Sequence, residues 1–191
     1  MLIKLPNKIK RALIFFFFFY LVLTVLSGIL AKRALSSTAK VAGAAKLQDL
    51  DATKAYIKDA KRDFQNVKWS LIAFTPIRVI PIFGWYVADS QRAVNAAIAA
   101  LDAAQTITEA VSPYADVLGF KGEGTFLGGT AQERIAQGLE TLAKVTPQLD
   151  EIGSDLKIAR KQIDNIQSWR YPNFLPGNPG EKIQTVKTSI D

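Results

Sequence analysis

The hydrophobic pattern begins with a long apolar stretch near the N-terminus. Residues 12–31 read ALIFFFFFYLVLTVLSGILA, twenty positions without a charged side chain. A helix rises about 1.5 Å per residue, so this stretch matches a hydrocarbon layer of about 30 Å. It therefore predicts a transmembrane helix, which we call the anchor segment. Basic side chains that can reach lipid headgroups flank it on both sides: Lys4, Lys8, Lys10, Arg11, Lys32 and Arg33.

A cleavable signal peptide is the alternative interpretation of this stretch. Signal peptides have apolar regions of about 7 to 15 residues, which is shorter than the anchor segment, and Ile29 stands where cleavage after Ala31 needs a small side chain. We therefore favour an uncleaved anchor. A short basic tail before a long polar body favours a cytoplasmic N-terminus and an extracytoplasmic body, although Lys40 and Lys46 nearly balance the N-terminal cations.

Beyond the anchor segment, apolar positions follow the spacing of amphipathic helices. No Pro occurs in residues 32–74, so we expect one continuous helix leaving the bilayer. The second half of this helix carries a heptad seam with alternating steps of three and four residues. The seam consists of Leu50, Thr53, Ile57, Ala60, Phe64, Val67, Leu71 and Phe74.

Two further helices are expected after this one. Residues 87–111 are Ala-rich with small side chains on two faces, which suits a middle helix packed on both sides. The glycine-rich stretch 119–130 predicts a loop. A third helix begins near Thr130, because Glu133 follows in capping-box spacing, and it contains Pro147, where we expect a kink or a break.

The predicted fold class is therefore all-α. One N-terminal transmembrane helix precedes an elongated, antiparallel, coiled-coil-like three-helix bundle. The expected segments are a short cytoplasmic tail (1–11), the transmembrane helix (12–31), an extracytoplasmic helical stalk or bundle (32–170), and a Pro/Gly linker with the start of a further segment (171–191).

Charge and composition exclude several classes of protein. The chain has 24 basic and 17 acidic residues, and six of the basic ones flank the anchor segment, so residues 34–191 carry only one net positive charge. Nucleic-acid binding is disfavoured because it needs a basic face, whereas the excess cations here suit anionic lipid. The chain has no Cys and no His. We identify no catalytic residues, no cofactor and no metal site.

One apolar region stands out as a candidate interaction tip. Pro76 and Pro81 break regular helix there and Gly84 permits a sharp turn. Expected helix lengths place this tip, together with Trp169, at the membrane-distal end. The candidate tip residues are Trp69, Phe74, Pro76, Arg78, Pro81, Phe83, Gly84, Trp85, Tyr86 and Trp169.

Arg78 is the charged residue within this tip. An arginine embedded in FTPIRVIPIF must reach water or find an acidic or carbonyl partner. Structural pairing is the favoured interpretation, with Asp89 as the first candidate partner, and recognition of an anionic partner is the alternative.

The order of these features resembles a known family. A basic N-terminus, one transmembrane helix, an Ala-rich helix and the tip TPIRVIPIFGWYVAD, with Pro76, Arg78, Pro81 and Gly84, are similar to the N-terminal region of the bacterial domain-of-unknown-function 4012 family. The resemblance covers residues 8–169. Members are usually longer, with an α/β extracytoplasmic portion after the helices, so the resemblance implies topology rather than activity.

The favoured function is a single-pass, membrane-anchored, extracytoplasmic helical scaffold or interaction protein of the cell envelope, and not an enzyme. Its expected partners are the lipid bilayer and an envelope protein or a second copy of the chain, with no nucleic acid. A ligand-binding or sensory helical ectodomain acting with a membrane partner is the alternative, but eleven residues before the anchor segment are too few to fold into an output domain.

The anchor prediction is testable by fractionation. The protein should resist carbonate extraction from membranes, and its mature N-terminus should retain the basic residues 4–11, because the uncleaved segment stays in lipid. Recovery of a soluble form beginning near Lys32 would contradict the anchor. If protease added from the outside leaves residues 34–191 intact, these residues lie on the cytoplasmic side, and the predicted orientation is wrong.

Overall fold

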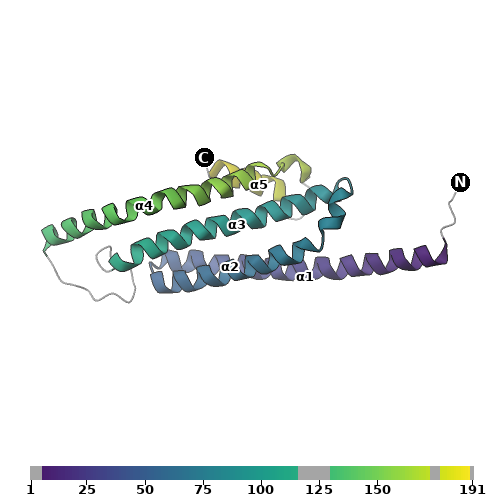
Figure 1. Cartoon of the computed structure of the whole chain (residues 1–191), viewed down its shortest axis with the longest axis horizontal. Helices are drawn as coiled ribbons and strands as arrows, with labels where there is room; N and C mark the ends of the chain where they lie inside the picture. Colours follow the sequence, from purple (N-terminus) through teal and green to yellow (C-terminus); the bar gives the residue numbers. More distant parts are fainter. Residues whose placement is uncertain (1–5, 116–129, 173–176, 190–191) are drawn as a thin grey trace.

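The structure, a computed structural model, describes residues 6–115, 130–172 and 177–189, and all regular elements in these ranges are helical. Four long helices lie side by side, and the N-terminal part of the first projects beyond the others (Figure 1). The all-α prediction is confirmed. The long helices are α1 (Asn7–Lys46), α2 (Leu50–Ile72), α3 (Phe83–Val111) and α4 (Ala131–Asp164), followed by the shorter α5 (Pro179–Ser189); 3₁₀ helices are η1 (Thr75–Val79), η2 (Ser112–Tyr114) and η3 (Ser168–Arg170).

Helix α1 contains the anchor segment and is long and apolar enough to cross a membrane. Among the described residues it is the one helix with this property. Its 40 residues correspond to about 60 Å. The second half of the helix belongs to the packed body, so the apolar segment and the body share one uninterrupted element.

The expectation of a continuous helix over residues 32–74 is wrong, because the chain reverses after Lys46. Gln48 adopts a positive φ of 57°, which turns the backbone out of the helix. Asp49 then caps α2, since its carboxylate accepts a hydrogen bond of 2.9 Å from the Ala52 N–H. This reversal contains neither Gly nor Pro, the residues on which the sequence interpretation relied.

The reversal also corrects the predicted three-helix stalk. Helix α2 runs back along α1, and the ring centroids of Tyr20 and Phe74 lie 5.7 Å apart. The end of α2 is therefore beside the anchor segment and not at the end of the body far from it. The long helices are four rather than three, and the α2–α3 connection lies toward the projecting end of α1 (Figure 1).

The main core forms where α1, α2 and α3 meet. It contains the buried side chains Ala34, Ala60, Phe64, Val67, Val94 and Leu101. The predicted heptad seam of α2 is confirmed, because every one of its positions from Leu50 to Phe74 is buried or half-buried. The seam therefore faces α1 and α3, as alternating steps of three and four residues require.

Helix α3 packs on both sides, as expected for the middle helix. Its second contact is with α4, where Ala96 and Ala99 meet Ala159 and Ile163. The predicted capping box at the start of α4 is confirmed: the Thr130 hydroxyl accepts from the Glu133 N–H, and the Glu133 carboxylate accepts from the Thr130 N–H. Helix α4 runs through Pro147, so of the two expected alternatives, a kink or a break, the break is wrong.

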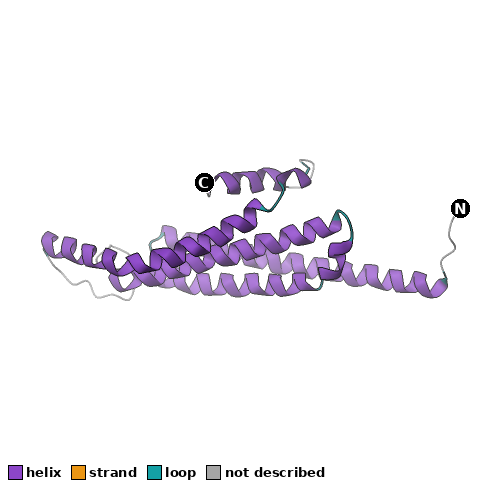
Figure 2. Cartoon of the chain, turned by 45° about the horizontal axis from the view of Figure 1, so that its top comes forward, coloured by secondary structure: helices purple, strands orange, loops and turns teal. Residues whose placement is uncertain are grey.

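The predicted C-terminal linker contains a helix. Helix α5 folds back onto η3 and the end of α4, as the oblique view shows (Figure 2). The Lys187 ammonium donates a hydrogen bond of 3.1 Å to the Asp164 carbonyl. Residues 119–129 of the predicted glycine-rich loop, and the side chains of Ile135, Leu142 and Val145 on α4, lie outside the described part of the chain.

The connection between α2 and α3, residues 73–82, is called here the α2–α3 turn. Ile82 has φ 71° and ψ −60°, and the Phe83 N–H donates to the Pro81 carbonyl over 2.9 Å, which is the geometry of a strained γ-turn. Gly84 was expected to make the sharp turn. It has ordinary backbone angles instead, and it is required because a Cβ there would overlap the carbonyl oxygen of Arg78.

Replacing Gly84 with Ala should therefore destabilise the protein. We expect Gly84→Ala to lower the free energy of unfolding by about 2 to 3 kcal/mol, because the backbone of the turn must move to admit a methyl group. Gly153→Ala is the matched control, since nothing lies within 4 Å of a Cβ there. The control should raise stability by about 0.5 to 1 kcal/mol through helix propensity. Chemical denaturation in detergent measures both, and equal effects would contradict the close approach.

Candidate functional site

The predicted tip residues divide into a buried and an exposed set. Phe74 and Gly84 are buried, whereas the side chains at the surface of the α2–α3 turn and its flanks are exposed. Trp85 and Trp169 meet edge to face with ring centroids 6.2 Å apart, so these two residues of the predicted tip are in contact. The exposed tip residues are Trp69, Pro76, Arg78, Pro81, Phe83, Trp85 and Trp169, and Tyr86 is half-buried.

The predicted pair of Arg78 with Asp89 is wrong. Arg78 is exposed on η1, and no ion pair joins it to any residue that the structure describes. Asp89 faces the other way, into the contact between α3 and η3. Arg78 therefore remains a charged side chain on an otherwise apolar surface.

Asp89 is the centre of a buried polar cluster. Its side chain is 1% exposed, and one carboxylate oxygen lies 2.7 Å from Nη1 of Arg92. The other oxygen lies 3.4 Å from both Nη1 of Arg170 and the hydroxyl of Tyr171. We call these four residues the Asp89 cluster. A buried carboxylate needs such partners, because burial of an isolated charge costs several kcal/mol.

Aromatic rings enclose the cluster on the side of η3. The guanidinium carbon of Arg170 lies 5.1 Å and 5.5 Å from the ring centroids of Trp85 and Trp169, which is cation–π distance. The Tyr86 hydroxyl donates a 2.9 Å hydrogen bond to the Arg170 carbonyl. These contacts fasten the segment after α4 to the start of α3.

Tyr171 acts in this cluster as a neutral donor. Burial, and then the charge of the neighbouring Asp89 carboxylate, raise the pKa of Tyr171 well above its usual range. The hydroxyl therefore keeps its proton and donates it in a hydrogen bond to Asp89. Proton transfer to solvent at neutral pH is not a chemistry that this geometry favours.

The Asp89 cluster was not predicted, and only part of it had a signal in the sequence. Asp89 and Arg92 are three residues apart on one helix, a spacing at which side chains meet. Arg170 and Tyr171 lie about 80 positions away, so no local pattern links them to Asp89. No group of three or more acidic side chains in the described ranges is placed to hold a metal ion.

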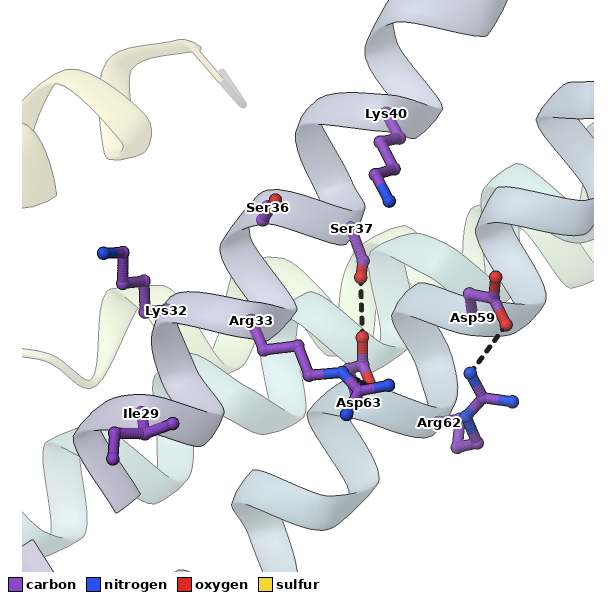
Figure 3. Close-up of a pocket in the computed structure, with 9 residues that line it drawn as sticks. All are labelled: Ile29, Lys32, Arg33, Ser36, Ser37, Lys40, Asp59, Arg62 and Asp63. Carbon is purple, nitrogen blue, oxygen red and sulfur yellow. Dashed lines mark hydrogen bonds and ion pairs between the residues drawn. The ribbon is translucent and has the colours of Figure 1, made fainter. Parts of the chain in front are cut away.

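A second polar feature is a groove between α1 and α2 of about 360 Å³ (Figure 3). Asp63 lies at its floor, 3% exposed, where Ser37 donates a 2.6 Å hydrogen bond to one oxygen and Nε of Arg33 lies 3.2 Å from the other. Four cations and two acids line this polar groove. Its lining residues are Ile29, Lys32, Arg33, Ser36, Ser37, Lys40, Asp59, Arg62 and Asp63.

The polar groove marks a boundary in both helices. Toward the N-terminus of α1 lies the uncharged anchor segment, and past Phe64 in α2 the next charged residues are Lys68 and Arg78. The contacts of Asp63 with Arg33 and Ser37 therefore fix the register of the two helices at the level where each changes from polar to apolar surroundings.

Comparison with protein-family models, with curated proteins and with solved structures finds no match for this chain. The resemblance to the domain-of-unknown-function 4012 family therefore stays a prediction.

The importance of the Asp89 cluster can be measured with a matched pair of variants. Asp89→Asn should lower the free energy of unfolding by about 3 kcal/mol, because two arginines lose their buried counter-charge. Asp102→Asn removes a partly exposed acid that lies 2.6 Å from Lys61, and it should cost less than about 1 kcal/mol. Equal losses in chemical denaturation would show that the cluster does not fasten η3 to α3.

Proposed function

We propose that this protein is a membrane-anchored helical scaffold or interaction protein of the cell envelope, with no catalysis of its own. It crosses the bilayer once through α1, with a cytoplasmic N-terminus and an extracytoplasmic helical body. The resemblance to the domain-of-unknown-function 4012 family agrees with this topology and is part of the same proposal.

The observation that carries the proposal is the construction of α1. Residues Ala12–Phe19 are exposed on every side, whereas from Tyr20 to Ala44 one face is covered by the body. A helix that is apolar and uncovered in one part and packed in the other suits attachment of a body to lipid. Lys8, Lys10 and Arg11 before the segment and Lys32 and Arg33 after it suit a fixed depth.

The outer face of α4 supports a role in protein contacts. Along α4 and just after it, Ile152, Ala159 and Ile166 are buried, but Leu149 and Leu156 are exposed. These two leucines lie seven residues apart and so share one line along the helix. These two exposed leucines lie beside the buried residues Ile152 and Ala159. A second helix, from another protein or from a second copy of this chain, can cover such a surface.

Site-specific photo-crosslinking tests this role. A photoreactive residue at Leu156, introduced into the full chain in its native membrane, should form a discrete adduct. The same residue at Lys58, which is exposed on the polar face of α2, should form none. An adduct of twice the chain mass identifies self-association, and another mass identifies a partner protein. Absence of adducts at both Leu149 and Leu156 would contradict the proposal.

A further inference from the structure

The anchor segment is too short, where it is free of the body, to cross a bilayer alone. Only Ala12–Phe19 is uncovered on all faces, and eight residues of helix span about 12 Å, less than half of a hydrocarbon layer of about 30 Å. From Tyr20 onward, one face of α1 is covered, first at Tyr20 and Leu23 and then at Ser27 and Leu30. Whatever covers this face must share the hydrocarbon layer with α1.

The covering elements are the end of α2 and the α2–α3 turn. Phe74 contacts the ring of Tyr20, and Leu71 packs with Leu30 and Ala31 against the main core. Tyr20 lies eleven residues before Ala31, which corresponds to about 16 Å of helix. The α2–α3 turn therefore reaches about one leaflet deeper than the polar end of the anchor segment.

The outer surface of this region has the composition that lipid contact requires. Val79 is 85% exposed and Trp69 is 72% exposed, and other large apolar side chains around the turn are also at the surface. Such a patch is unusual on a surface in contact with water. The large exposed apolar side chains around the turn are Trp69, Ile72, Val79, Ile80, Ile82, Phe83 and Trp85.

Several backbone N–H groups of the α2–α3 turn are satisfied without water. Irregular backbone is costly in lipid because each unpaired N–H or C=O loses its hydrogen bond to water. Pro76 and Pro81 have no N–H to satisfy. The N–H groups of Ile77, Ile80 and Phe83 donate within the turn, and those of Gly84 and Trp85 donate back to Ile80 and Ile82.

Charges are few in the segment that forms this region, and the guanidinium carbon of Arg170 in η3 also lies 5.1 Å from the ring centroid of Trp85. Residues 64–88 carry only Lys68 and Arg78, whereas the polar groove lies immediately beyond Phe64. In α2, which runs toward the anchor segment, Cβ atoms tilt toward the polar groove, so Lys68 can extend its ammonium to the headgroups. Farther along α3, Asp89 is paired within the protein.

From these observations we infer that the α2–α3 turn and the end of α2 are embedded in the lipid leaflet on the side of the body. The polar groove then lies at headgroup level. This inference rests on the proposed function for α1 as the anchor, and it adds a second element of the protein to the membrane. The exposed Ile82 in a strained γ-turn contributes nothing to the core, and lipid contact gives that side chain a role.

Depth measurements with single labels test the inference. Because the chain has no Cys, one environment-sensitive fluorophore can be attached at a single introduced cysteine in the full-length protein. The positions are Val79→Cys in the turn, Phe16→Cys in the free part of the anchor segment, and Leu47→Cys at the opposite end of α2; all three side chains are exposed. Each protein is reconstituted in vesicles of phosphatidylcholine and phosphatidylglycerol, with and without brominated acyl chains.

The label at position 79 should lose as much fluorescence to brominated lipid as the label at position 16, and the label at position 47 should lose none. Loss at position 16 without loss at position 79 would overturn the inference and leave the anchor intact. No loss at position 16 would overturn the anchor, and the inference with it.

Arg78 gives a second, independent readout. A single cation in the leaflet holds the turn toward the headgroups, so Arg78→Leu in the Val79→Cys protein should increase the loss of fluorescence at position 79. If the turn faces water or a protein partner, brominated lipid will not quench the label at position 79, either with Arg78 present or after Arg78→Leu. That result would contradict the inference.

Discussion

The structure depends on the antiparallel contact between α1 and α2. This contact begins at Tyr20, inside the apolar anchor segment, and continues to Ala44, so one face of α1 is packed against protein. The opposite face is exposed, without charges up to Ala31 and with charged residues from Lys32 onward. The 2.6 Å hydrogen bond from Ser37 to Asp63 and the ion pair of Arg33 with Asp63 fix its register. With α2 placed in this way, α3 starts from the end of the bundle where Phe74 meets Tyr20, and the segment after α4 returns to the start of α3, where Trp169 meets Trp85.

Helix periodicity made much of the fold predictable from the sequence. The heptad seam of α2 and the capping box of α4 depend on neighbouring residues, and both are confirmed. The reversal at Gln48 has no Gly or Pro to mark it, although Asp49 with Asp51 in the first turn is a local signal for a helix start. Missing that one reversal moved the apolar turn from the anchored end to the distal end.

The sequence pointed to the residues of the apolar tip, but not to their contacts, to the Asp89 cluster or to the polar groove. The aromatic residues and Arg78 stand out by type, and Trp85 does meet Trp169. The partners of Asp89 did not follow from sequence distance, because α4 brings Arg170 and Tyr171 back to the start of α3 only after the chain has reversed three times. Long-range polar contacts of this kind depend on the whole topology, and a misplaced reversal makes the nearest charge in sequence look like the best partner.

The continuity of α1 has a mechanical consequence. No break separates the part of the helix that is free from the part that is packed in the body, so the two tilt as one rigid rod. Apolar helices respond to bilayer thickness by changing their tilt, at a cost of fractions of a kcal/mol per Å of mismatch. With α1 spanning the bilayer as proposed, such a change would rotate the bundle with respect to the membrane plane. Local lipid composition would then affect the angle at which the outer face of α4 is presented.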